Sequence, residues 1–177
     1  MGLSMGDLAQ NPHPFGQIPC LVNDNKDEGE IVVFESGAIL LYLNNIGNPK
    51  DSNEGDIFSW VCWANASLDP ICFLETPDGK VYDTGLKNTN NRRIQRLNQI
   101  LESRKFLVGE SITVADVAVA SYLLYVIQFF PDIDLSAWPQ IVRYLKDCAS
   151  RNGYSKAFGE PVQAFLLDKL ETMSQGS

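Results

Sequence analysis

Two short motifs near the start of the chain, Phe15 to Pro19 and Glu35 to Leu40, narrow the choice of folds more than any other segment. Ile18 precedes a proline, and a residue in that position is pushed out of the helical region into extended backbone. Ser36 opens an apolar helical pattern, where unpaired N–H groups and the helix dipole favour a carboxylate. Glu35 beside it can meet an ammonium group. The pair therefore predicts a site for a small peptide with extended backbone, a carboxylate and an amine.

The surroundings of the two motifs predict a β-hairpin followed by a helix. Two short apolar runs are expected to form strands, Ile18 to Val22 and Ile31 to Phe34. The polar stretch between them, Asn23 to Glu30, predicts a mobile hairpin tip. The helix is expected over Ser36 to Asn45, because Gly47 and Pro49 follow it as breakers. The segment from Asn44 to Asp56 is rich in Asn, Gly, Pro, Asp and Ser, which is typical of a linker.

Beyond residue 56 the pattern predicts helices, and we expect the strands to disappear. Asp69-Pro70 is expected to end the first of these helices, and Pro77-Asp78-Gly79 is a strong turn signal. The run from Val117 to Ile127 is apolar on nearly every side, so it should lie at the centre of a bundle. The other expected helices cover residues 57–68, 89–103, 138–149 and about 158–173.

Thr113 and Asp116 stand at the spacing of a capping box in front of the central helix. The Thr113 side chain can accept from the N–H of residue 116, and the Asp116 carboxylate can accept from the N–H of residue 113. Loss of such a cap costs roughly 1 kcal/mol and up to about 2. We assign this motif to folding rather than to chemistry.

Composition limits the partners of the chain. Its 177 residues, 45% hydrophobic and 20% charged, describe a globular protein, and the net charge of −8 argues against nucleic acid. The longest apolar run is too short to span a bilayer, so no membrane association is expected. The densest basic group is interpreted as a solvated helix face and comprises Arg92, Arg93, Arg96, Arg104 and Lys105.

The cysteines have no metal-ligand spacing, and the only histidine is His13, so no metal is expected. Reduced and mostly buried thiols in a cytoplasmic protein are the preferred interpretation of Cys20, Cys62, Cys72 and Cys148.

Asn11 to Leu43 resembles the second half of the glutathione-binding domain of the glutathione S-transferases. Gly109 to Asp116 resembles the helical C-terminal domain of the same family. The amino-acid sequence of these segments is also similar to the transferase-like domain of elongation factor 1-gamma, which serves assembly. The resemblance implies a mainly α fold: a truncated thioredoxin-like segment, a β-hairpin plus helix over residues 1–47, followed by an all-helical C-terminal bundle over residues 48–177.

The resemblance also implies roles for individual residues. Gln17 and Ile18 match positions that hold the cysteinyl backbone of glutathione, and Pro19 matches a proline that is cis in the family. Glu35 and Ser36 match positions that hold the γ-glutamyl end. A plain helix cap is the alternative interpretation of the latter two residues.

Two aromatic residues on the central helix, Tyr122 and Tyr125, are candidates for lining a pocket for an apolar electrophile, with core packing as the alternative. The family activates the glutathione thiol with a Ser, Tyr or Cys after its first strand. That strand is not in this sequence, so no catalytic residue is carried over.

Two functions follow as hypotheses. The first is a glutathione transferase that binds glutathione as a substrate and, if complete, conjugates it to hydrophobic electrophiles. The second is a non-catalytic assembly module with the same fold. A homodimer or a hetero-complex is implied by the resemblance alone.

The missing first strand leads to a prediction about stability. One side of the Ile18 to Val22 strand would lack a partner strand, and an isolated two-stranded hairpin is only marginally stable in water. We expect that residues 1–35 are loosely held, that another chain completes the sheet, or that a longer product exists. Slow hydrogen exchange of the Ile18 to Val22 amides in a purified monomer would contradict this expectation.

Overall fold

The computed structural model describes residues 11–25, 29–47 and 53–175. The chain divides into two compact units, Met1–Ser52 and Asn53–Ser177, and each is described by itself. The middle of the expected hairpin tip, the middle of the expected linker and the first ten residues lie outside the described residues.

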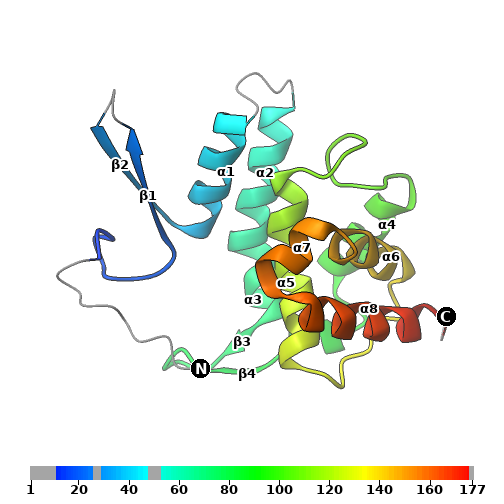
Figure 1. The fold of residues 1–177 in the computed structure, drawn as a ribbon. Coiled ribbons are helices and arrows are strands. Elements are labelled where there is room, and N and C mark those ends of the chain that lie inside the picture. Colours follow the sequence, from blue (N-terminus) through cyan, green and yellow to red (C-terminus); the bar gives the residue numbers. More distant parts are fainter. Residues whose placement is uncertain (1–10, 26–28, 48–52, 176–177) are drawn as a thin grey trace. The chain divides into compact units, whose positions relative to one another are not determined.

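The first unit contains a hairpin and a helix, coloured blue to cyan in Figure 1. Strand β1 (Cys20–Asn25) pairs with β2 (Gly29–Phe34) in antiparallel register, with Cys20 opposite Phe34. Helix α1 (Ser36–Gly47) follows directly, and the Asn23 side-chain amide donates to the Tyr42 hydroxyl at 2.7 Å, which ties β1 to α1. The predicted hairpin and helix are therefore confirmed.

The predicted start of the first strand is wrong. Ile18 and Pro19 lie outside the ladder, which begins at Cys20. Pro19 has no N–H to donate, so a ladder bond cannot be made there. As the family resemblance implied, the Ile18–Pro19 peptide bond is cis.

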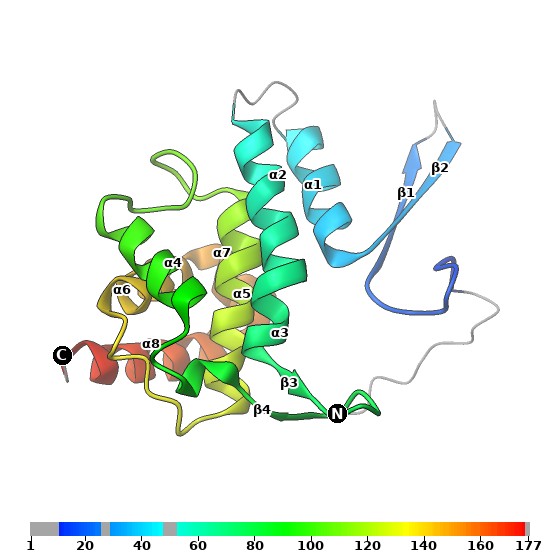
Figure 2. The ribbon, with the colours of Figure 1, turned by 180° about the vertical axis from the view of Figure 1, so that it is seen from behind.

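The second unit is built mainly from helices. Figure 2 shows them from the side opposite to Figure 1. The elements are α2 (Glu54–Trp63), η1 (Ala64–Leu68), α3 (Asp69–Cys72), β3 (Leu74–Glu75), β4 (Val81–Asp83), η2 (Gly85–Lys87), α4 (Arg92–Glu102), α5 (Val114–Phe129), α6 (Pro139–Ala149), α7 (Asn152–Phe158) and α8 (Glu160–Gln175).

The first helix of this unit does not end where the sequence suggested. Helix α2 passes through the π-helical turn η1 into α3, and Pro70 lies in the first turn of α3. Pro70 has no N–H to donate, and it directly follows a turn where the regular helical ladder is already interrupted, since the Asp69 N–H donates to the Ala64 carbonyl five residues back. The helix therefore ends at Phe73, whose backbone is extended, rather than at Asp69-Pro70.

The expectation that strands disappear after residue 56 is also wrong. Strands β3 and β4 form a small antiparallel sheet around the predicted Pro77-Asp78-Gly79 turn. The Thr76 N–H donates to the Lys80 carbonyl at 2.9 Å, and Gly79 has φ 77°, a conformation that glycine adopts without steric cost. The strands are too short for alternation of polar and apolar residues to reveal them in sequence.

Helix α5 lies at the centre of the helical unit, as its apolar pattern predicted. It packs against α2, α3, α6 and α8. Its buried residues face several sides of the helix and are Ala115, Asp116, Ala118, Val119, Ala120, Leu123, Leu124, Val126 and Ile127. Burial of nearly the whole circumference explains why this helix has no polar face.

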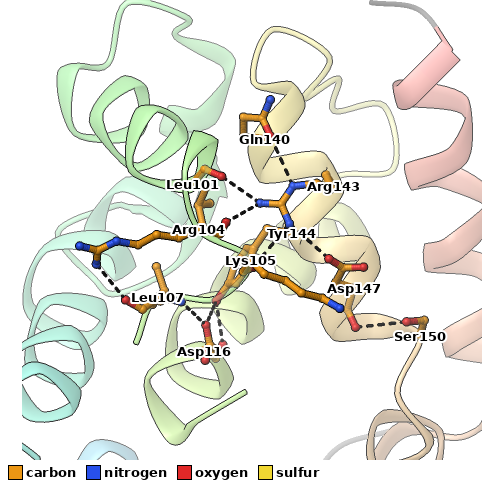
Figure 3. A network of polar contacts seen from close by, with 10 residues as sticks. All are labelled: Leu101, Arg104, Lys105, Leu107, Asp116, Gln140, Arg143, Tyr144, Asp147 and Ser150. Atoms are coloured by element: carbon orange, nitrogen blue, oxygen red, sulfur yellow. Dashed lines mark hydrogen bonds and ion pairs between the residues drawn. The ribbon is translucent and has the colours of Figure 1, made fainter. Parts of the chain in front are cut away.

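The capping box at the start of α5 is present. Asp116 also makes contacts that the sequence did not indicate, with Leu107 and Tyr144 (Figure 3). Asp116 is fully buried, and one of its carboxylate oxygens accepts from the Thr113 N–H at 2.8 Å. The other oxygen accepts from the Leu107 N–H at 2.9 Å and from the Tyr144 hydroxyl at 3.2 Å. Burial raises the pKa of Asp116, although the hydrogen bonds from Leu107, Thr113 and Tyr144 act in the opposite direction. One side chain thus joins the loop before α5, the helix itself and α6.

A second set of polar contacts joins α4 to α6. The Asn98 side-chain oxygen accepts from the N–H groups of Gln140 and Ile141 at 3.0 and 3.2 Å, so a residue of α4 caps the start of α6. The Arg143 guanidinium donates to the carbonyls of Leu101 and Arg104 at 3.0 and 2.9 Å (Figure 3). These carbonyls lie at the end of α4, where a cation is favoured by the helix dipole.

A hairpin plus helix followed by a helical bundle is the fold class expected from sequence, and it is confirmed. The structure adds α7 and the β3–β4 hairpin to the expected elements. The domain boundary between residues 47 and 48 stays a prediction.

Replacement of Asp116 by alanine should lower the free energy of unfolding by at least about 2 kcal/mol, because the buried Leu107 N–H and the part-buried Thr113 N–H lose their acceptor and the buried Tyr144 hydroxyl keeps only the carbonyl of residue 116. Urea unfolding followed by circular dichroism measures this change. Asp134→Ala is the matched control, since Asp134 accepts from Ser136 at the surface. Equal losses in the two variants would contradict the role assigned to the buried carboxylate.

Candidate functional site

The five residues expected to bind a peptide ligand all lie in the first unit, at one end of its hairpin. Cys20 opposes Phe34, so the backbone before Cys20 and the backbone after Phe34 leave the ladder at the same end. Ile18 and Pro19 therefore approach from one strand, and Glu35 continues from the other. The side chains concerned are exposed to solvent: Gln17, Ile18, Pro19, Glu35 and Ser36.

The loop before β1 is held by its own hydrogen bonds. The Asn11 side chain accepts from the His13 N–H at 3.0 Å and donates to the Gln17 carbonyl at 3.1 Å. The Phe15 N–H donates to Nδ1 of His13 at 3.0 Å, so a neutral His13 carries its proton on Nε2. These bonds position the backbone of Gln17 directly before the cis bond.

His13 anchors this loop to the hairpin. Its side chain is buried, and its ring meets the Phe34 ring edge-on with centroids 5.0 Å apart. In the sequence, His13 entered only the argument against a metal site and was given no structural role. The signal that could have found it is the Asn-Pro-His-Pro run, because Asn side chains commonly bond to backbone two residues further on.

Glu35 joins the hairpin to the helix in a strained conformation. Its carbonyl accepts the first helical hydrogen bond, from the Ile39 N–H at 2.9 Å, so Glu35 is the cap residue of α1. Its φ is 68°, in the left-handed region that a residue with a β-carbon occupies at a cost of order 1–3 kcal/mol. Conformations of this kind cluster at functional sites. No sequence signal marks this strain, since glycine is the usual residue there.

The start of α1 presents donors next to the Glu35 carboxylate. The N–H groups of Ser36, Gly37 and Ala38 belong to the first turn and have no acceptor within the helix. Together with the Ser36 hydroxyl they form a place for a carboxylate, which the helix dipole also favours. An ammonium group on the same ligand can pair with Glu35. The arrangement therefore suits a zwitterionic peptide end rather than a metal.

No group of three or more potential metal ligands occurs within the described ranges. Among the same residues, no helix is both long enough and apolar enough to cross a membrane.

Tyr122 and Tyr125, the candidates for an apolar pocket, belong to an aromatic cluster on α5 in the second unit. The Tyr122 hydroxyl donates to the Asn65 side chain at 3.2 Å, and its ring lies 6.3 Å from that of Phe73. Tyr125 stacks on Phe129 with centroids 5.8 Å apart, and Phe129 is 63% exposed. Both tyrosines are half-buried.

The four thiols are free and differ in exposure. Cys72 and Cys148 are buried, Cys20 is half-buried, and Cys62 is exposed. Only the exposed Cys62 differs from the expectation of mostly buried thiols. Burial raises the pKa of Cys148 to about 12 and also raises that of Cys72 strongly. Both buried thiols are therefore protonated at neutral pH and are poor nucleophiles.

Comparison with known proteins gives a consistent result. The family model for the glutathione S-transferase C-terminal domain matches residues 61–152. Elongation factor 1-gamma of Danio rerio is 26% identical over 162 residues, which cover 83% of this chain and 35% of that protein. A glutathione S-transferase domain-containing protein of Dictyostelium discoideum is 30% identical over 151 residues, covering 75% of this chain and 56% of that protein.

A solved structure has the same fold. The glutathione transferase of Burkholderia graminis, crystallised with two glutathione molecules bound per subunit, has a TM-score of 0.65 and 22% identity. The match covers 84% of this chain and 69% of that one. The chain thus spans between about a third and just over half of the length of these two curated relatives.

Exposure and thiol pKa predict an order of alkylation. Iodoacetamide at neutral pH should modify Cys62 first in the folded protein, and Cys72 and Cys148 only after unfolding, because the thiolate is the reactive form. Mass spectrometry of tryptic peptides over a time course measures this order. Modification of Cys148 as fast as Cys62 would show that its burial is not maintained in solution.

Proposed function

The chain belongs to the glutathione S-transferase family, and we propose that the junction between its hairpin and α1 binds glutathione. The register of the hairpin carries this proposal, because it brings Ile18-Pro19 and Glu35-Ser36 to the same end of the two strands. The strained cap at Glu35 supports it.

The γ-glutamyl and cysteinyl parts of the tripeptide each have a complementary group at this junction. The γ-glutamyl carboxylate is held by the Ser36 hydroxyl and the N–H groups of the first turn of α1, and the γ-glutamyl ammonium by Glu35. The backbones of Gln17 and Ile18 pair with the cysteinyl residue of glutathione. Pro19 sets the direction of the chain at this point, because its ring fixes φ.

A catalytic role requires activation of the bound thiol. A cysteine thiol has a pKa near 8.5, and lowering it by about two units takes roughly 2.7 kcal/mol of preferential thiolate stabilisation. No described residue is assigned this task. In a complete enzyme the reaction is conjugation of glutathione to hydrophobic electrophiles, and Tyr122 and Tyr125 are then the residues proposed to contact the electrophile.

The second candidate is a non-catalytic assembly module of the same fold. The observation that favours it is the similarity to elongation factor 1-gamma, which extends over 83% of this chain. The module would act in the cytoplasm as a homodimer or as part of a hetero-complex with another transferase-like domain.

Two measurements distinguish these candidates. Retention on immobilised glutathione together with turnover of a chloro-dinitrobenzene substrate supports the transferase. Absence of both, with a stable hetero-complex in pull-down from cells, supports the assembly module.

Ser36→Ala should lower the affinity for glutathione about fivefold, because one hydrogen bond to a charged group is lost at a cost of about 1 kcal/mol. Isothermal titration calorimetry measures the dissociation constant. Ser155→Ala is the control, since Ser155 is a helical serine of the second unit whose hydroxyl bonds only locally, to the Asn152 carbonyl. Unchanged affinity in Ser36→Ala would remove Ser36 from the site.

Glu35→Gln should weaken glutathione binding several-fold but leave the binding of N-acetylglutathione unchanged. The acetylated ligand has no ammonium group, so the charge on residue 35 has nothing to pair with. Competition titration with both ligands measures the two affinities. An equal loss for both ligands would mean that Glu35 does not contact the ammonium group.

A further inference from the structure

Helices α5 and α7 of the second unit, together with the end of α6, border a surface pocket of about 310 Å³ (Figure 1). We call it the α5–α7 pocket and define it by six of its lining residues: Ile112, Ala120, Leu124, Arg151, Tyr154 and Phe158. The residues proposed to contact glutathione or the electrophile are not among the described residues that line it.

The lining of the pocket is mainly apolar. Ala120 and Leu124 of α5 are buried and form its inner part. At its rim, Val117 of α5 and Phe158 of α7 are 42% and 38% exposed, so apolar side chains remain uncovered there. A concave site of this size and lining is typical of sites that bury the body of a small molecule.

One wall of the pocket is held in place by aromatic contacts. The Phe158 ring lies 4.7 Å from the Tyr154 ring, and it meets the Tyr125 ring edge-on with centroids 6.0 Å apart. Opposed pairs of rings of this kind fix the position of each member. The partly exposed Phe158 is therefore ready to contact a ligand without a costly rearrangement.

A cation stands beside this apolar lining. Arg151 is exposed, and no ion pair of the described residues includes it, whereas Arg143 of α6 pairs with Asp147 at 3.2 Å. The charge of Arg151 reaches the inner lining: burial raises the pKa of Cys148 to about 12, and the guanidinium acts in the opposite direction. A guanidinium in this position favours a carboxylate, to which it can donate two parallel hydrogen bonds.

Asp116 is the one acidic residue among the described residues of the lining. It is fully buried, and its oxygens accept hydrogen bonds from Leu107, Thr113 and Tyr144, which offset its negative charge. No ion pair within the described ranges joins it to Arg151. The guanidinium is therefore available to a ligand.

We propose that the α5–α7 pocket binds a small monocarboxylate with an apolar body. The carboxylate pairs with the Arg151 guanidinium, and the apolar body lies between Leu124 and Ala120 on one side and Phe158 on the other. A peptide would leave backbone N–H and carbonyl groups unpaired against this lining, which favours a small molecule. The proposal does not depend on glutathione binding at Ser36.

The test is a titration of the full chain with 4-phenylbutanoate and with its neutral analogue 4-phenylbutanamide, followed by ¹H–¹⁵N NMR spectroscopy. The carboxylate should bind with a dissociation constant below about 1 mM, and the largest shifts should fall on amides of α5 and α7. The amide should bind at least fivefold more weakly, because it cannot form the charged pair. Raised salt should narrow this difference, since screening weakens ion pairs.

Arg151→Gln should lower the affinity for the carboxylate at least fivefold and leave the affinity for the amide unchanged. Lys156→Gln is the matched control, because Lys156 is exposed on α7, is not part of the described lining and makes the same change in net charge. It should leave both affinities unchanged.

Ala157→Leu tests the apolar part of the pocket without a change of charge. Ala157 is an exposed lining residue of α7, so the larger side chain can be accommodated by the fold while it occupies space that the ligand needs. Both ligands should bind more weakly to this variant. The dispersion of the amide signals checks that each variant is folded.

Four outcomes would overturn the proposal. They are equal affinity for the carboxylate and the amide, an equal loss in Arg151→Gln and Lys156→Gln, unchanged affinity in Ala157→Leu, and shifts centred on the start of α1. The last outcome would mean that the carboxylate occupies the site proposed for glutathione. Loss of glutathione binding in Ser36→Ala, by contrast, leaves the α5–α7 pocket unaffected, so the two proposals fail separately.

Discussion

The buried carboxylate of Asp116 is the interaction on which the helical unit depends. It accepts hydrogen bonds from Thr113, Leu107 and Tyr144, which belong to the cap of α5, the preceding loop and α6. A buried charge is costly unless it is fully hydrogen-bonded, so the three elements must meet at one place for the unit to be stable. The position of α5 follows from this constraint, and the helices that pack against α5 are positioned with it.

The two units present different kinds of surface. In the first unit, a strained cap at Glu35 and the start of α1 offer a carboxylate beside backbone donors, an arrangement that complements a zwitterion. In the second unit, tryptophans of α2 and arginines of α4 line one surface groove. Both surfaces use pre-organised polar groups next to apolar ones, and they draw on different residues. A single variant can therefore test one without disturbing the other.

Much of the fold was predictable because its signals are local. The hairpin, α1 and the capping box each rest on residues close together in sequence, and each is confirmed. The errors have physical causes: Pro70 is tolerated in the first turn of α3, and β3 and β4 are too short to show alternation. The glutathione-site residues were named from sequence and stay predictions. The positive φ of Glu35 left no sequence signal, and the anchoring by His13 left only the Asn-Pro-His-Pro run.

Pattern and spacing were enough to establish the order of elements, the apolar central helix and the residues that flank the first hairpin, because propensity, capping and turn chemistry act between near neighbours. Only the tertiary structure showed that Asp116 reaches Tyr144, that Asn98 caps α6, and that Trp60 and Arg96 line one groove. These contacts join residues far apart in sequence. They depend on how helices pack, and packing is decided by the burial of many side chains at once rather than by any local motif.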